Sequence, residues 1–473
     1  MHNNEKTFLF YDYETFSPNK YHTRIASVAM VRTTMDLEQI GEPIVLYCKL
    51  GLDFLPHPES CLIHGLSPQF VNENGVTEDI LIAKVLEEFS KENTIVVGYN
   101  SINFDDEVTR ATLYRNLIDP FTGWAKDRWD IIKLVRAVRD YKPATLKLEK
   151  LSPDTGWTSF HLPDVAEQNE IEQTKAHDAL FDVLATIGIA KLIKEKQSKM
   201  FDYYLEHRTQ EEIDNLFATD SNHEIILYTN SVPIKDHSFT THPLLPLYFE
   251  RDYYGKLTKI VGFDLSYEVP EEINEESTDY MVEINTKKCP FIIRPRKFPA
   301  EMEAASGLDW ITCLERQNRV LQNPAFSSLA RKKKVYEKPS ADPEVNIYEF
   351  PSSQAKEKMR RLLNLAPSQR LKDPKPFTSD RDQKFNEILF RHVARNYTDS
   401  LTLTEKQTWI DYCRRRITGI DDMAPEKEPL YLSDYYSSIS ELENEYQDGK
   451  PKELLTELRE YGKYVENMIG LNQ

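Results

Sequence analysis

Two acidic residues follow the first apolar run of the chain, and this arrangement constrains the fold more than any other feature. Residues Thr7 to Tyr11 have the length and composition of a buried strand, and Asp12 and Glu14 come directly after them. Because residues two apart in a strand share a face, both carboxylates point the same way. Such a pair is costly unless a cation lies between the acids. If it stood alone, an acidic turn after an edge strand would be the simpler explanation.

A second acidic segment follows another expected strand, residues 94–99. Open α/β sheets bind their ligands at the carboxyl ends of strands, so Asp105 is predicted to be the third carboxylate of the site. Two neighbouring acids have simpler roles. Asp106 fits the cap of the helix that follows, and the negative charge of Glu107 interacts favourably with the dipole of that helix. Taken singly, Asp105 fits the start of a helix as well as it fits a metal ligand.

A third segment places His177 just before a strongly periodic helix and Asp182 in the first turns of that helix. An isolated histidine in this position is more often structural or exposed. Together with three acids at strand ends, however, His177 and Asp182 are predicted to face the same site.

These residues supply the parts of a metal-dependent hydrolytic site. Asp12, Glu14, Asp105 and Asp182 offer enough oxygen ligands for two divalent ions about 3.5–4 Å apart, the separation used in phosphoryl displacement. Mg²⁺ suits such ligands, with Mn²⁺ as an alternative. His177, with an ordinary pKa near 6.5, is the predicted base for the attacking water. All five residues are therefore predicted to be catalytic.

The distribution of apolar runs predicts three domains. Residues 1–200 alternate between strands and helices, as an α/β domain does. Residues 201–350 hold short β-like runs and one helix near 310–321, so a mostly β domain is expected. A polar, proline-containing segment, 336–353, resembles an extended linker. Amphipathic helices then predict a helical domain over 354–473; they are expected at 353–363, 381–396, 404–416, 432–448 and 451–468.

Composition limits the location and the partners of the chain. The 473 residues contain no apolar run of membrane-spanning length and no secretory signal, so we expect a cytoplasmic protein without a membrane partner. Five scattered cysteines without a CxxC pair predict neither disulfides nor a zinc site. A net charge of −18 argues against a protein that simply coats nucleic acid. Nucleic acid would have to bind in a local basic and aromatic groove.

The acidic motifs resemble those of the DEDDh exonucleases, a superfamily with an RNase H-like fold. More narrowly, the chain resembles the bacterial exodeoxyribonuclease I family over nearly its whole length. The segments that carry this resemblance are FLFYDYETF, GEPIVLYCK, LIHGLSPQ, GYNSINFDDEVTRATLYRN, DRWDII and AHDALFDVLATIGIAKLIK. The resemblance implies an exonuclease domain, an SH3-like β domain and a helical domain in a monomer. It also implies digestion of single-stranded DNA from the 3′ end to 5′-mononucleotides, in DNA repair and recombination.

The resemblance further suggests residues that contact DNA and a partner. Candidate DNA contacts are Phe104, Arg110, Arg128, Trp129 and Lys147. Aromatic residues such as Phe104 and Trp129 are more often part of the core, and the two arginines are more often helix-surface residues or structural ion pairs. Lys147 stands at a place that resembles one where the family has an arginine. The family also binds the acidic C-terminal tail of the single-stranded-DNA-binding protein. Candidate residues for that tail are Arg294, Arg296, Lys297, Arg316 and Arg319, which otherwise fit an ordinary basic surface.

Two other functions stay open at this point. A DEDDh nuclease that acts on short RNA shares the motifs, but such enzymes are typically single domains. A catalytically silent scaffold would be free to lose one of the five site residues, and this chain keeps all of them.

Overall fold

The computed structural model describes residues 5–121, 124, 127–171, 178–218, 224–234, 239–332, 340–373, 375–420 and 430–471. No helix among these residues is long and apolar enough to cross a lipid bilayer. The five cysteines are all described, and each is buried as a free thiol.

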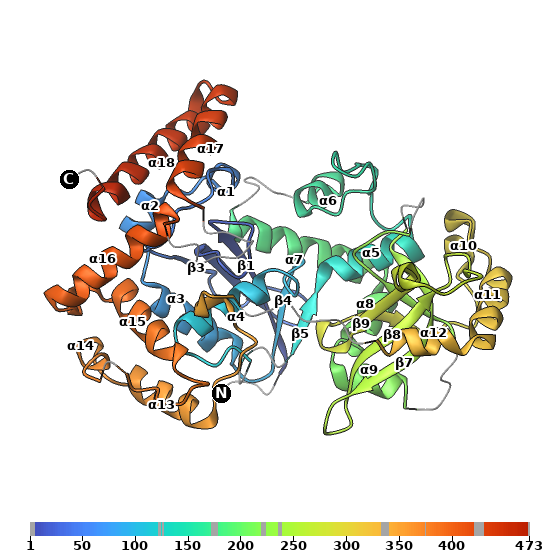
Figure 1. Cartoon of the computed structure of the whole chain (residues 1–473). Coiled ribbons are helices and arrows are strands. Elements are labelled where there is room, and N and C mark those ends of the chain that lie inside the picture. Colours follow the sequence, from blue (N-terminus) through green and yellow to red (C-terminus); the bar gives the residue numbers. More distant parts are fainter. Residues whose placement is uncertain are drawn as a thin grey trace.

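A five-stranded mixed sheet organises the N-terminal part of the chain (Figure 1). Its order is β3-β2-β1-β4-β5, with β1 antiparallel to β2 and parallel to β4, and β5 parallel to β4. The carboxyl ends of β1, β4 and β5 therefore meet at one edge. The strands are β1 (Thr7–Thr15), β2 (Ile25–Thr33), β3 (Ile44–Tyr47), β4 (Thr94–Gly98) and β5 (Arg128–Asp130).

Helices cover both faces of this sheet, because the side chains of β1 alternate between two apolar clusters. Phe8 and Phe10 lie in the cluster that contains Val183 of α7 (Ala179–Lys196). Leu9 lies in the other cluster with residues of α3 (Glu78–Phe89) and α4 (Asp105–Arg115). The remaining helices of this part are α1 (Pro58–His64), α2 (Pro68–Asn74), α5 (Ile131–Tyr141) and α6 (Leu162–Gln168).

A second sheet, entirely antiparallel, has the order β10-β6-β7-β8-β9. Its strands are β6 (Ile226–Thr229), β7 (Thr241–Arg251), β8 (Leu257–Asp264), β9 (Met281–Asn285) and β10 (Phe291–Ile293). Around it lie α8 (Ser198–Glu206), α9 (Gln210–Leu216), α10 (Ala300–Ser306), α11 (Trp310–Gln322), α12 (Pro324–Ala330) and the 3-10 turns η1 (Glu275–Tyr280) and η2 (Thr286–Lys288). The predicted β-rich middle region is thus confirmed, with more helix than expected.

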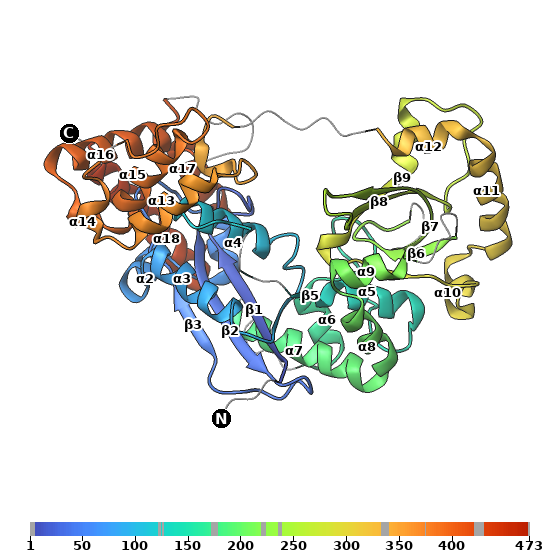
Figure 2. The same ribbon diagram turned by 90° about the horizontal axis from the view of Figure 1, so that it is seen from below.

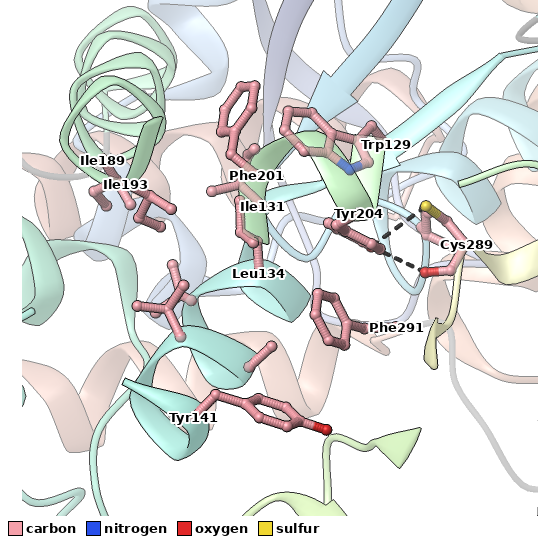
Figure 3. Packing of buried hydrophobic residues seen from close by; sticks show 14 of the residues in the cluster. Trp129, Ile131, Leu134, Tyr141, Ile189, Ile193, Phe201, Tyr204, Cys289 and Phe291 are labelled. Atoms are coloured by element: carbon pink, nitrogen blue, oxygen red, sulfur yellow. Dashed lines mark hydrogen bonds between the residues drawn. The ribbon is translucent and has the colours of Figure 1, made fainter. Parts of the chain in front are cut away.

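The two sheets share one continuous core rather than meeting at a thin linker (Figure 3). The Trp129 ring of β5 lies 4.9 Å from the Phe201 ring of α8, measured between centroids. Tyr204, also on α8, lies 5.2 Å from Phe291 of β10. Helix α8 therefore joins the first sheet to the second.

Helices form the C-terminal part and pack on the first sheet's side of the molecule, away from the second sheet (Figure 2). They are α13 (Ser353–Leu363), α14 (Pro367–Arg370), α15 (Lys384–Asn396), α16 (Leu403–Thr418), α17 (Leu432–Glu445) and α18 (Gly449–Met468), with 3-10 turns η3 (Pro343–Val345) and η4 (Thr398–Ser400). The predicted helical region is confirmed.

The prediction of an extended linker over 336–353 was wrong for its described portion. Asp342 and Glu344, in and beside η3, are each only 2% exposed. Asp342 accepts hydrogen bonds from Arg391 and Arg416, both at 2.7 Å, and Glu344 from Arg395 at 3.0 Å. Polar, proline-containing sequence suggested a solvated spacer, but its acids are buried partners of helix arginines.

Candidate active site

Three carboxylates meet at the carboxyl end of β1. Asp12, Glu14 and Asp182 each offer an oxygen, and these oxygens all lie within 4.8 Å of one another. Strand alternation brings Asp12 and Glu14 to the face covered by α7, and Asp182 lies in the first turn of that helix. The structure confirms the predicted grouping of these three residues. Asp12 and Glu14 therefore do not form an isolated acidic turn after an edge strand.

Asp105 approaches the same cluster from the end of β4. The charge of Asp105 is, after burial, the largest contribution that raises the pKa of Asp12. Asp105 is 5% exposed and opens α4, so it is at once the start of a helix and a neighbour of the acids. The backbone N–H of Tyr13, which lies between the two β1 acids, interacts with the Asp105 carboxyl group and lowers its pKa against the larger effect of burial.

Burial and mutual repulsion shift the protonation of the cluster. Burial, followed by the charge of Asp182, raises the pKa of Glu14 to about 8. Burial, followed by the charge of Asp106, raises the pKa of Asp105 to about 8. The pKa of Asp12 is raised well above its ordinary value. A divalent cation would relieve this repulsion, because carboxylates brought together at low dielectric are unfavourable without one.

His177 lies outside the described residues. The described chain resumes at Asp178, whose side chain caps α7 by accepting a hydrogen bond from the backbone N–H of Leu180 at 3.2 Å. The role of His177 as a base therefore stays a prediction.

Asp130 supports the site and was not among the predicted site residues. It lies at the carboxyl end of β5, and its two oxygens accept hydrogen bonds from the backbone N–H groups of Asn100 (2.8 Å) and Ile102 (3.3 Å). Asn100 has a φ of 62°, a left-handed conformation that asparagine tolerates better than most residues. Asp130 of β5 therefore holds the turn that leads from β4 to Asp105. The segment DRWDII, which contains Asp130, was the sequence feature from which this role could have been predicted.

Two of the five predicted DNA contacts, Trp129 and Arg128, are occupied within the protein. Trp129 is completely buried and stacks on Phe8 at a centroid distance of 5.7 Å, which leaves no ring face for a base, so this prediction was wrong (Figure 3). Arg128 is 10% exposed and forms an ion pair with Asp106. Trp129 is therefore a core residue and Arg128 belongs to a structural ion pair, which are the alternatives that the sequence left open.

The other three predicted contacts keep some exposure. Phe104 is half-buried at the N-cap of α4, next to Asp105. Arg110 forms an ion pair with Glu107 at 2.7 Å, and its guanidinium lies 5.6 Å from the Phe121 ring centroid. Lys147 is exposed and pairs with Glu170 at 2.8 Å.

An exposed aromatic group next to α4 was not predicted from the sequence. Tyr348 and Phe350 are 56% and 45% exposed, and their ring centroids lie 5.6 and 5.0 Å from that of Phe121. The Tyr348 hydroxyl donates to Glu107 at 2.8 Å, two residues after Asp105. Because Tyr348 is 241 residues from Glu107 in the chain, no local pattern could have linked them.

The predicted partner residues lie in two segments: Arg316 and Arg319 on α11, and Arg294, Arg296 and Lys297 after β10. Arg316 donates to the carbonyl oxygens of Leu265 and Ser266 at 2.9 and 3.1 Å, and Arg319 to that of Val269 at 2.9 Å. Arg294 pairs with Glu224 at 2.6 Å. Arg296 and Lys297 are exposed after β10, and Leu314 of α11 is 39% exposed.

Two protein families match separate regions of the chain, and known proteins are similar to it over nearly its whole length. Residues 9–190 match the family described as Exonuclease, and residues 341–465 match the family described as Exonuclease I C-terminal domain. Exodeoxyribonuclease I of Haemophilus influenzae is 32% identical, over 96% of this chain and 98% of the relative. That of Escherichia coli is 28% identical, over 98% of both chains.

Solved structures agree with these matches. Exonuclease I of Methylocaldum szegediense has a TM-score of 0.84 at 29% identity, covering 97% of this chain and 99% of the other. Escherichia coli exonuclease I in complex with a dA16 oligonucleotide has a TM-score of 0.84 at 27% identity, covering 98% and 100%. With the acidic cluster at the end of β1, these similarities show that the chain belongs to the exodeoxyribonuclease I family and is a 3′–5′ exonuclease.

Proposed function

We propose that the protein hydrolyses single-stranded DNA from its 3′ end, releases 5′-mononucleotides and acts in DNA repair and recombination. The observation that carries this proposal is the convergence of the Asp12, Glu14 and Asp182 oxygens within 4.8 Å. Membership of the family supports the substrate, since an Escherichia coli relative was solved with a dA16 oligonucleotide.

The proposed cofactor is Mg²⁺, bound as two ions by Asp12, Glu14, Asp105 and Asp182, with Mn²⁺ as an alternative. The donors fit a hard divalent cation, because they are carboxylate oxygens whose pKa values are raised first by burial and then by the charges of the neighbouring acids. Bound ions would activate water and stabilise the charge on the leaving oxygen. We propose His177 as the residue that accepts the proton from that water.

The proposed path of the DNA passes the exposed aromatic group next to α4. Bases stack on aromatic faces at about 1–3 kcal/mol each, without a sequence preference. Phe104 adjoins Asp105 in the chain, and Tyr348 and Phe350 offer exposed ring surface next to α4. Arg110 of α4 adds a positive charge. Lys147 remains a candidate farther along. A local surface of this kind reconciles DNA binding with a net charge of −18.

The proposed protein partner is the acidic tail of a single-stranded-DNA-binding protein. One solved structure of the family is described as an SSB/Exonuclease I complex. Arg316 and Arg319 share α11 with the exposed Leu314, and Arg296 and Lys297 are exposed after β10. Together they offer the charge and the apolar contact that such a tail needs. We also propose a monomer with three units, predicted from the sequence as residues 1–200, 201–350 and 354–473. The contacts of Asp342 and Glu344 with arginines of α15 and α16 favour moving the last boundary to about residue 341.

Digestion of an oligonucleotide labelled at its 5′ end tests the substrate and the polarity together. Single-stranded DNA, matched duplex DNA and RNA of the same sequence would be compared at one enzyme concentration with Mg²⁺. We expect a ladder that shortens from the 3′ end on single-stranded DNA alone. Faster digestion of RNA would support the alternative of an RNA nuclease, and binding without digestion would support a silent scaffold.

A further inference from the structure

Strand β1 carries functional side chains on both of its faces. Asp12 and Glu14 face α7, while Tyr11 and Tyr13 point to the opposite face, where α4 packs. Both tyrosines are nearly inaccessible, at 2% and 5% exposure. Their hydroxyl groups do not end in the apolar core, because each reaches a polar group of α4.

Tyr13 is connected to Asp105 by a chain of two hydrogen bonds. The hydroxyl groups of Tyr13 and Thr109 lie 2.9 Å apart, and the Thr109 hydroxyl donates to the backbone carbonyl of Asp105 at 2.8 Å. A hydroxyl group has one hydrogen, so Thr109 must accept from Tyr13. The strand that holds two acids is thereby tied to the main chain of the third.

Tyr11 makes a second connection, one residue along the helix. Its hydroxyl donates to Asp106 at 2.7 Å. The Arg128 guanidinium forms an ion pair with the same carboxylate and donates to the Tyr11 hydroxyl at 3.1 Å. Asp106 is 1% exposed, so this network is screened from solvent and holds the first turn of α4 against β1 and β5.

We propose that Tyr11, Tyr13, Asp106, Thr109 and Arg128 form a clamp, called here the α4 clamp, whose function is to position Asp105 for metal binding. The inference rests on the proposed metal site. None of the five touches the cluster as a ligand, so they are positioning residues. Partners that orient a metal ligand typically change metal affinity or activity about 10- to 100-fold when they are removed.

Metal affinity separates this role from simple stabilisation of the helix. Binding of Mn²⁺ to the full-length protein, without DNA, would be measured by electron paramagnetic resonance of the free ion. We expect Tyr13→Phe and Thr109→Val to raise the dissociation constant about 10-fold. Thr109→Ser keeps the hydroxyl and should bind almost as the unmodified protein does. Tyr11→Phe tests the second connection if one of the first two variants does not fold.

Tyr435→Phe is the matched control. Tyr435 of α17 is completely buried and donates to the backbone carbonyl of Leu458 in α18 at 2.6 Å, so the variant loses a comparable bond between two helices of the C-terminal part. It should lower the melting temperature and leave Mn²⁺ binding unchanged. Tyr13→Phe and Thr109→Val that bind Mn²⁺ as tightly as the unmodified protein would overturn the clamp alone. Equal Mn²⁺ binding by the unmodified protein and Asp12→Asn would instead overturn the proposed metal site.

Discussion

At the residue scale, the ionised Asp12 carboxylate destabilises the metal-free protein. Burial and the charges of Asp105, Glu14 and Asp182 all raise its pKa. Asp12→Asn keeps the shape and removes the ionisable group, so we expect it to stabilise the protein in chelator at neutral pH and to abolish turnover. Thermal unfolding measures this; Asp36→Asn, which removes an exposed acid paired with Lys194, should not stabilise. A lower melting temperature for Asp12→Asn would contradict the account.

Because Glu14 titrates, the free energy of unfolding of the metal-free protein should depend on pH. Its pKa is raised from 4.5 to about 8, so the folded protein retains a proton that the unfolded chain has lost. Stability from this group is complete below pH 4.5 and is lost as the pH rises toward 8. We expect Glu14→Gln to remove that loss in chelator. Unfolding in urea at several pH values measures it, and a stability difference between the two proteins that does not grow with pH would refute the assignment.

The positions of single residues could be predicted where the periodicity of a strand or a helix determines which way a side chain points. Asp12 and Glu14 follow strand alternation and Asp182 the first turn of a helix, so their meeting could be inferred from the sequence. Trp129 could not be assigned correctly, because β5 is three residues long and shows no alternation that separates a core ring from an exposed one. Asp130 was missed for the same reason.

At the scale of elements, the turn between β4 and α4 depends on Asp130. Asp130→Asn replaces one acceptor of the Asn100 and Ile102 N–H groups with a donor, at a position that is completely buried. We expect a loss of about 1–3 kcal/mol and slower turnover, because Asp105 is displaced. Urea unfolding and DNA hydrolysis measure the two effects.

Asp309→Asn is the control for that variant. Asp309 caps α11 through two backbone N–H groups at 3.2 and 3.1 Å, but on an exposed surface far from the acids. It should leave turnover unchanged. Normal turnover by Asp130→Asn would show that the turn between β4 and α4 does not position Asp105 for catalysis.

Elements with long apolar runs were predicted within a few residues, as the agreement of 353–363 with α13 and of 310–321 with α11 shows. Short helices such as α1 and α2, seven residues each, were missed because two turns are too few to display a periodic face. Strand β5 takes its conformation from pairing with β4, a tertiary contact that local sequence does not reveal.

At the scale of the whole molecule, buried ion pairs join the C-terminal helices to the first sheet. Arg395 of α15 binds Asp53 at 2.7 Å and Glu344 at 3.0 Å, and Arg24 binds Asp53 at 3.3 Å. The arginines hold the pKa of Asp53 well below its usual range despite burial. The polar segment around Glu344 looked like a linker because its partners lie about 50 residues away in the chain.

Breaking this network should cost much more than breaking an exposed pair. Arg395→Met removes the shortest ion-pair partner of two buried acids, Asp53 and Glu344, so we expect a loss of about 3–5 kcal/mol in urea unfolding. Arg459→Met removes the partly exposed pair with Glu443 at 2.7 Å and should cost less than about 1 kcal/mol. Equal losses in the two variants would show that the network does not hold the C-terminal helices in place.

The most direct test of the central claim is single-turnover hydrolysis of 5′-labelled single-stranded DNA across a Mg²⁺ titration, by the unmodified protein and by Asp182→Asn, with DNA binding measured in chelator. We expect a ladder from the 3′ end whose rate saturates with Mg²⁺ and vanishes in chelator. Asp182→Asn should bind DNA normally but cleave about 100-fold more slowly or worse, since a direct ligand matters at least as much as an outer partner. Cleavage that persists in chelator, or an Asp182→Asn protein that cleaves at the normal rate, would contradict a metal-dependent site at the end of β1.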